Sequence, residues 1–379
     1  MSAHSPARKK ALLGLSSLFV LAALGAAGWW YLHRGSETTD DAYVAGNVVP
    51  VSSRVAGNVL SLHGEETQQV AAGSLLVALD ETDAKLALLR AQTQLAQTVR
   101  QLAQQQRELD QLDATVGLRQ AELARAQGDQ ARREVLGQSN AVGREEVLHA
   151  RQSVAEAKAG VAVAQAQKAA LQAKLLDTPL AQQPEVLYAA EQLREAWLDL
   201  QRTRILSPVT GIIAKRNVQV GSHVAVGASL FAVVPMDQLW VDANFKEIQL
   251  AEIRVGQPVT LSADLYGDEV VYHGTVEGLA AGTGSVFSLL PAQNATGNWL
   301  KVVQRLPVRI KLDAAELTKH PLRLGLSMLV TVDVSDTSGT HVTDAPVDNA
   351  IASTDVLTQD MAPVDSLIAQ IIANNRQAS

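Results

Sequence analysis

The side chains that most often carry out chemistry are sparse in this 379-residue chain. There is no Cys, which excludes a disulfide framework, a thiolate nucleophile and a lipidated cysteine. None of the eight His residues stands at metal-ligand spacing from another His; they are His4, His33, His63, His149, His223, His273, His320 and His341. The sequence therefore predicts no metal site.

Motifs for catalysis are also missing. The sequence has no Gly-rich phosphate loop and no G-x-S-x-G nucleophile elbow. Its acidic residues in helical segments fall at solvated heptad positions, so they do not suggest a paired acid and base. We expect no catalytic residue, no cofactor and no enzyme activity.

Composition and charge narrow the class of protein further. The net charge is −7 with both signs interspersed, which argues against nucleic acid as a partner. Hydrophobic residues make up 47% of the chain but aromatic residues only 4%, so Ala, Leu and Val supply most of the apolar content. This balance favours long, thin helices over one large globular core.

An uncharged stretch at residues 11–32 is long enough to cross a membrane as a helix. Basic residues precede it, and an aromatic belt closes it at Trp29, Trp30 and Tyr31. The positive-inside rule places residues 1–10 in the cytoplasm and the bulk of the chain outside. The alternative is a cleaved signal peptide, but Trp-Trp-Tyr is a poor cleavage site.

Residues 51–80 and 205–234 form an internal repeat that aligns without a gap at an offset of 154. Each copy consists of short β-type runs separated by Gly, and we expect these glycines to supply positive φ angles. The segments 51–80 and 204–235 resemble the two halves of a lipoyl or biotinyl carrier domain, a small flattened β-sandwich. A swinging-arm carrier is an alternative, but Lys85, the nearest lysine, lacks the flanking motif.

Residues 82–203, between the repeats, predict a coiled-coil helical hairpin with its tip at 137–143. Apolar residues recur every seven positions on the outgoing arm, at Leu88, Leu95, Leu102, Leu109, Val116 and Leu123. The returning arm has two such rows, Val147, Val154, Val161 and Leu175, interrupted by Lys168, and Ala150, Ala157, Ala164 and Leu171. Pro179 and Pro184 break that arm near its root. A dimerising coiled coil is the alternative, but the partner strand lies in the same chain.

The remaining segments predict a second β region and a tail. Alternating apolar runs at 236–334 suggest a small β-barrel, to which residues 38–50 should add a strand. Residues 335–379 should form a flexible tail with a short amphipathic helix at 364–373. We expect this helix to pack on the body of the protein, and partner binding is the alternative. The predicted fold class is α+β.

This order of elements resembles the membrane fusion protein family (HlyD family), also called periplasmic adaptors. Several strings are similar to the EmrA type, among them TDDAYVAGNVV at 39–49, RTRILSPVTGII at 202–213, WVDANFKE at 240–247 and FSLLPAQNATGNWLKVVQRLPVRI at 287–310. The resemblance covers nearly the whole chain.

The resemblance implies a scaffold at the inner membrane of a Gram-negative bacterium, with its bulk in the periplasm. It would join an EmrB-like exporter of the major facilitator superfamily to a TolC-like outer-membrane channel, as a homo-oligomer (trimer or hexamer). The exported compounds would be drugs or toxic amphiphiles. An adaptor for an ATP-driven exporter or a type I secretion system is one alternative, and a purely structural envelope tether is another.

The resemblance also implies two candidate sites. Arg132 and Leu136 match the family pattern at the hairpin tip, while Gly143 replaces its Ser or Thr. The candidate tip residues for channel docking are Arg132, Leu136, Asn140, Gly143, Arg144, Glu145 and Glu146. A loop between barrel strands could line the conduit or contact a neighbouring subunit, through Phe287, Leu289, Leu290, Asn294, Asn298 and Trp299. The alternative is a loop that packs against the barrel.

Overall fold

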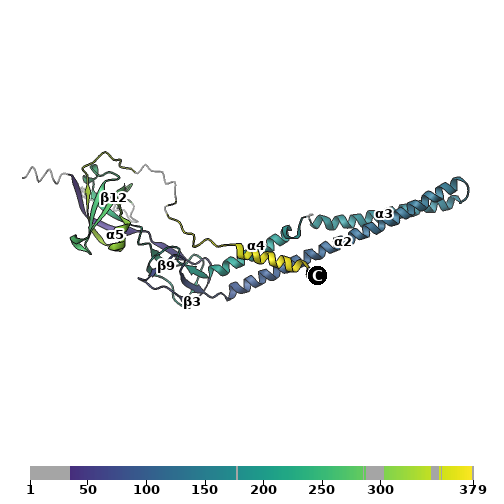
Figure 1. The fold of residues 1–379 in the computed structure, drawn as a ribbon, viewed down its shortest axis with the longest axis horizontal. Helices are drawn as coiled ribbons and strands as arrows, with labels where there is room; N and C mark the ends of the chain where they lie inside the picture. Colours follow the sequence, from purple (N-terminus) through teal and green to yellow (C-terminus); the bar gives the residue numbers. More distant parts are fainter. Residues whose placement is uncertain are drawn as a thin grey trace, which may run out of the picture.

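A computed structural model of the chain describes residues 35–175, 178–284, 286, 303–342, 350 and 352–377. The predicted anchor at 11–32 lies outside these ranges. Within them, no helix combines the length and the hydrophobicity that a membrane crossing needs. The molecule is elongated, with a β-barrel at one end, a β-sandwich next to it and a helical hairpin that extends to the other end (Figure 1).

Six strands close the barrel, in the order β1-β10-β13-β12-β11-β14. Their bounds are β1 (Ser36–Gly46), β10 (Leu239–Lys246), β11 (Pro258–Ala263), β12 (Val271–Leu279), β13 (Arg305–Leu312) and β14 (Ser327–Asp333). Alternate residues of β10 are buried, as expected of a strand with one face on a core. Between strands lie helix α5 (Ala314–Lys319) and the short 3₁₀ turns η2 (Gln249–Ala251) and η3 (Gly267–Glu269). The predicted barrel is confirmed.

The first barrel strand ends earlier than we expected. We assigned residues 38–50 to it, but β1 ends at Gly46, and β2 (Val49–Ser52) joins the sandwich by pairing with β9 (Ser229–Val234). At Gly46 a Cβ atom would lie 2.6 Å from a methyl group of Leu239. A side chain at residue 46 would therefore force the Leu239 side chain to move.

The sandwich consists of two four-stranded sheets, β2-β9-β7-β4 and β6-β5-β3-β8. The other strands are β3 (Gly57–Leu62), β4 (Gln69–Val70), β5 (Leu75–Leu79), β6 (Arg204–Leu206), β7 (Gly211–Arg216) and β8 (His223–Val224). Each sheet takes two strands from each half of the internal repeat, so neither half can bury its apolar face alone.

Hydrogen bonds repeat across the two halves at the same offset of 154 residues. The Ser53 carbonyl accepts from the Gly227 amide at 2.8 Å, and the equivalent Ser207 carbonyl accepts from the Gly73 amide at 2.8 Å. Both serine side chains are buried, and each hydroxyl donates to the carbonyl two residues further on. The repeated sequence therefore produces a domain with pseudo-twofold symmetry.

The glycines of the repeat have two different roles. Gly73 and Gly227 have φ angles of 81° and 83°, which confirms the predicted positive φ at these turns. Gly57 and Gly211 do not have positive φ, so the same expectation was wrong for them. A Cβ atom on Gly211 would lie 2.3 Å from the Val234 carbonyl oxygen, and the close approach of two backbones explains this glycine.

Thr67 is strained relative to its repeat partner. It has a φ of 72°, whereas the equivalent position in the second half is Gly221, with a φ of 82°. A β-branched residue is costly in this conformation, so Thr67→Gly should stabilise the sandwich by about 1 kcal/mol. The gain should appear as slower hydrogen exchange at the amides of β4 and β7. Gly221→Thr is the matched control and should destabilise the sandwich. Unchanged hydrogen exchange in this variant would show that the positive φ angle is not costly for a β-branched residue here.

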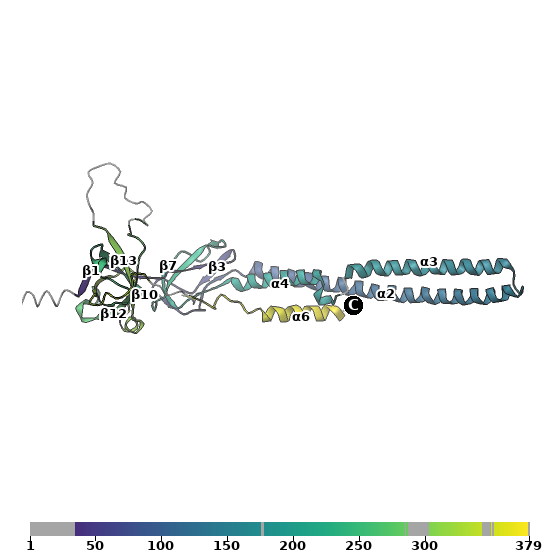
Figure 2. The same ribbon diagram turned by 90° about the horizontal axis from the view of Figure 1, so that it is seen from above.

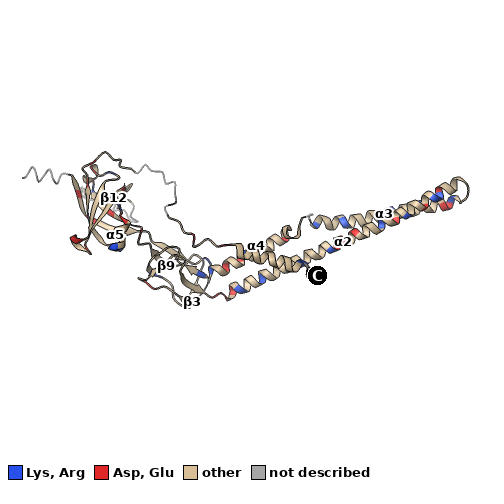
Figure 3. Ribbon diagram, viewed as in Figure 1, with Lys and Arg blue, Asp and Glu red and all other residues tan. Residues whose placement is uncertain are grey.

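The hairpin comprises α2 (Thr82–Gln138), α3 (Arg144–Leu175), the 3₁₀ turn η1 (Leu180–Gln182) and α4 (Pro184–Arg202). Helix α2 has 57 residues and is about 86 Å long. The predicted heptad positions on both arms are buried or half-buried, and Lys168, which interrupts one row, pairs with Asp113. The helical hairpin is confirmed, and acidic and basic residues are mixed along it (Figure 3).

The break in the returning arm is built around Gln183. Its side chain is buried, and its amide group donates to the carbonyls of Leu175 and of Thr178 (3.0 Å to the latter). Pro184 occupies the first turn of α4, where a missing N–H is tolerated. Gln183 thus satisfies the Leu175 carbonyl, which the end of α3 leaves unpaired, and the Thr178 carbonyl in the connection that follows.

The C-terminal helix α6 (Ala362–Gln377) packs along α2 and α4 at the root of the hairpin (Figure 2). Val364 and Ile368 are buried there in one cluster with Leu95, Val99 and Leu193. Arg194 forms an ion pair with Asp365 at 2.7 Å, and Arg100 donates to Asn375 at 3.0 Å. We expected a flexible tail with a helix at 364–373; the helix is longer and is held by a buried apolar face.

Candidate functional site: the hairpin tip

The turn at the tip spans residues 139–143, because α2 continues to Gln138 and α3 begins at Arg144. The Leu136 carbonyl accepts from the Ala141 amide at 2.9 Å and from the Ser139 hydroxyl at 2.8 Å. Asn140 adopts a φ of 58°, a left-handed conformation that Asn tolerates better than most residues. Asn140 therefore reverses the chain, a role that our assignment as a docking contact did not include.

Gly137 lets the two arms approach closely just before the turn. A Cβ atom at this position would lie 3.0 Å from a methyl group of Val147 on α3. We predicted Gly137 as part of the turn, but it is helical. Gly143, in contrast, has nothing within 4 Å of where its Cβ would be, so packing does not require glycine there.

Three aliphatic side chains are exposed around the turn. Leu136 is 45% exposed, and the neighbouring Val135 and Leu148 are 66% and 55% exposed. Leu136 is one of the predicted tip residues, whereas Val135 and Leu148 are not. The available signal was that Val135 and Leu148 are apolar residues outside the predicted heptad rows. Together they give the tip an apolar surface that could contact another protein.

The charged candidates lie around this surface. Arg144, Glu145 and Glu146 are exposed. Arg132 forms an ion pair with Asp129 one turn earlier in the same helix, so its charge is partly compensated. The structure thus brings all seven predicted tip residues to one end of the hairpin, on either side of the turn.

A polar bridge joins the two arms below the tip. Glu134 accepts hydrogen bonds from Gln130 at 2.9 Å and from Arg151 of α3 at 2.9 Å. The hydrogen bond from Gln130, followed by that from Arg151, lowers the pKa of the Glu134 carboxyl below its ordinary value. The carboxylate is thus held in its charged form, in which it links the two arms through Arg151.

The other predicted site residues lie outside the described residues: Phe287, Leu289, Leu290, Asn294, Asn298 and Trp299 of the barrel loop, and Trp29, Trp30 and Tyr31 of the anchor belt. In the part of the chain that the structure describes, no group of three His, Asp or Glu residues could hold a metal ion.

Comparisons with known proteins match both the hairpin and the barrel. The family model for the EmrA alpha-helical hairpin domain matches residues 82–203, and that for the AAEA-like beta-barrel domain matches residues 238–334. The multidrug export protein EmrA of Escherichia coli is 48% identical over 347 residues, which cover 92% of this chain and 89% of that protein. The chain belongs to the EmrA family of periplasmic adaptors.

The chain is also similar to a second curated protein and to a solved structure. The fatty acid resistance protein FarA of Neisseria gonorrhoeae is 46% identical over 370 residues, covering 97% of this chain and 93% of that protein. A solved structure of the periplasmic adaptor protein EmrA aligns with a TM-score of 0.40 at 19% identity, covering 79% of this chain and 98% of that one.

Family membership confirms the predicted class of protein. Adaptors of this family are non-enzymatic linkers that act in export with an inner-membrane transporter and an outer channel, and they form oligomers. The functional site of such a protein is therefore a surface that contacts other proteins.

Proposed function

We propose that this adaptor links a proton-driven, EmrB-like exporter of the major facilitator superfamily to a TolC-like outer-membrane channel, for efflux of drugs or toxic amphiphiles. The observation that carries the proposal is the placement of an exposed apolar tip at the end of a helix about 86 Å long, far from the barrel (Figure 1). This length suits a bridge across the periplasm.

The proposal includes the anchor and the assembly. Residues 11–32 hold the chain in the inner membrane, with the barrel near the exporter. One hairpin cannot enclose a passage, so several copies stand side by side, as a trimer or a hexamer. The 287–299 loop residues named above line the conduit or contact a neighbouring copy.

Photo-crosslinking in cells tests the contact at the tip. Probes replace Leu136, Asn140 and Arg144 one at a time, and a probe at Leu118, which is exposed on the hairpin shaft, is the matched control. We expect the tip probes to capture an outer-membrane channel protein and the Leu118 probe to capture none. Tip probes that find only inner-membrane proteins, in a folded and abundant adaptor, would refute direct docking.

A probe at the other end of the molecule separates the two types of exporter. Ile248, beside strand β10 of the barrel, is 84% exposed and is available for contact. Capture of a protein with many membrane spans and no nucleotide site would support the proposed exporter. Capture of an ATP-binding subunit would favour the ATP-driven alternative.

A further inference from the structure

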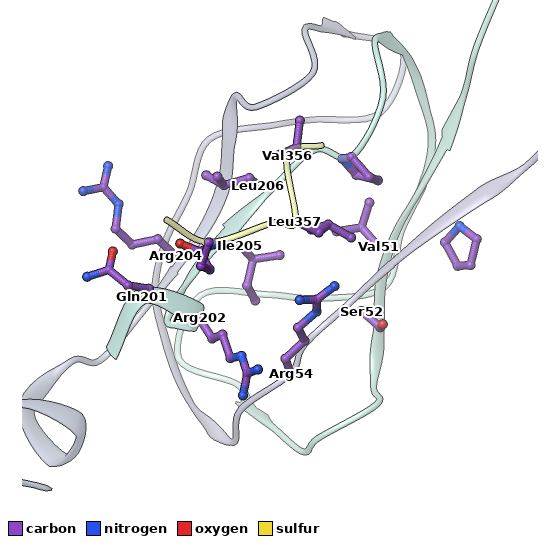
Figure 4. Close-up of a pocket in the computed structure, with 13 residues that line it drawn as sticks. Val51, Ser52, Arg54, Gln201, Arg202, Arg204, Ile205, Leu206, Val356 and Leu357 are labelled. Carbon is purple, nitrogen blue, oxygen red and sulfur yellow. The ribbon is translucent and has the colours of Figure 1, made fainter. Parts of the chain in front are cut away.

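A cavity of about 120 Å³ lies where the sandwich, the end of α4 and the C-terminal segment meet (Figure 4). Its floor comes from the first strand of each repeat half, with Val51 of β2 and Ile205 of β6 among the lining residues. These two residues are equivalent at the repeat offset of 154. The cavity therefore lies at the contact between the two halves of the sandwich.

The C-terminal segment covers one side of this cavity. Val356 and Leu357 of this segment line the cavity. Just before them in the chain, the Thr354 hydroxyl donates to the Pro208 carbonyl at 2.6 Å. This hydrogen bond fastens the segment to the sandwich before the chain continues into α6. The cavity thus exists because residues more than 140 positions apart in the sequence meet here.

All the charged residues that line the cavity are arginines. Arg54, Arg202 and Arg204 line it, and no Asp or Glu does, although the chain as a whole has a net charge of −7. Arg54 also breaks the repeat, because its equivalent in the second half is Pro208. The rest of the lining is aliphatic or uncharged and polar, so the cavity is complementary to an anion with a short apolar chain.

The three arginines are not equivalent. In Figure 4 the Arg54 side chain points towards Leu357, whereas that of Arg204 points away from the cavity. Arg202 donates to Asp199 at 3.3 Å, and its Nε atom is buried without a hydrogen-bond partner among the described residues. Arg54 has no hydrogen bond or ion pair with another described residue. Arg54 is exposed, so its guanidinium is open to an acceptor in the cavity. A buried donor without a partner, such as the Arg202 Nε atom, is uncommon in proteins, so an acceptor bound here would satisfy it.

We propose that this cavity binds a small aliphatic carboxylate, or the carboxylate end of a larger anionic amphiphile. Arg54 and Arg202 would donate to the carboxylate, while Val51, Val356 and Leu357 contact the chain. The volume is below that of drug-sized sites, so only a short chain fits. A bound ligand would touch both repeat halves and the C-terminal segment, and would therefore stabilise their contact. The proposal does not depend on the exporter or channel proposed above.

Ligand-observed NMR on the full chain in detergent micelles tests the site with three probes of equal chain length: hexanoate, hexanol and hexylamine. Empty micelles give the baseline for each probe. We expect hexanoate to bind at least about fivefold more tightly than the other two, because only its carboxylate pairs with Arg54 and Arg202. Hexanoate should also slow hydrogen exchange in residues 352–361.

Variants assign the binding to this cavity. Arg54→Gln should weaken hexanoate binding about fivefold, whereas Arg204→Gln, the matched control, should change it less than twofold. Leu357→Asp places a like charge beside the ligand and should remove measurable binding. Circular dichroism verifies that each variant is folded. Equal binding of hexylamine, equal effects of the two Arg variants, or unchanged binding in folded Leu357→Asp would each overturn the proposal.

Discussion

Gly211→Ala should destabilise the β-sandwich by about 3 kcal/mol, while Gly57→Ala, the same change at the equivalent position, should cost less than about 1 kcal/mol. At Gly211 the new Cβ atom would lie 2.3 Å from the Val234 carbonyl oxygen and 2.7 Å from its carbon, so the strands must separate. At Gly57 the nearest atom is a methyl group of Leu79 at 3.4 Å, an ordinary contact.

Hydrogen exchange at the amides of β7 and β9 is the suitable measurement. The chain has several domains, so one global transition would not isolate the sandwich. Exchange there should accelerate by about two orders of magnitude in Gly211→Ala and little in Gly57→Ala. Equal acceleration in the two variants would show that the repeat halves are energetically equivalent, against the geometry.

Val364→Asp should release helix α6 from the hairpin. Val364 is 0% exposed and lies in a cluster with Leu95, Val99 and Leu193, where an aspartate would have no partner in the surrounding apolar side chains. Burying an unpaired charge costs several kcal/mol, more than one docked face can offset, so the helix should detach instead. The Arg194–Asp365 ion pair would be lost with it.

Detachment is measured by hydrogen exchange and limited proteolysis of residues 352–377. We expect protection of α6 to fall by at least about 100-fold, equivalent to roughly 3 kcal/mol of docking. Ala369→Asp is the matched control, because Ala369 is an exposed position of the same helix. If α6 stays protected in Val364→Asp, or is lost equally in Ala369→Asp, the buried face does not hold the helix.

The hairpin, the internal repeat and the turn glycines could be predicted from the sequence, because each depends on a regular spacing of residue types along the chain. A buried seam between two helices requires apolar residues at heptad spacing, so the hairpin was visible in the sequence from Leu88 to Leu175. The repeat at an offset of 154 indicated two halves that must meet, and the sheets do take strands from both. Turn glycines were predictable at Gly73 and Gly227, where φ is positive.

Other features depend on contacts between residues that are distant in the sequence, and only the tertiary structure decided these. The need for glycine at 211 comes from the backbone at Val234, and the Leu239 side chain limits the space at Gly46. Val135 and Leu148 lie outside the predicted heptad rows, but only the structure shows how far each side chain is exposed beside the turn. The amphipathic pattern at 364–373 predicted a helix that packs on the body of the protein, but it did not predict that the helix packs on α2 and α4. That position and the arginine-lined cavity arise because segments distant in the sequence converge, and local periodicity does not show which segments meet.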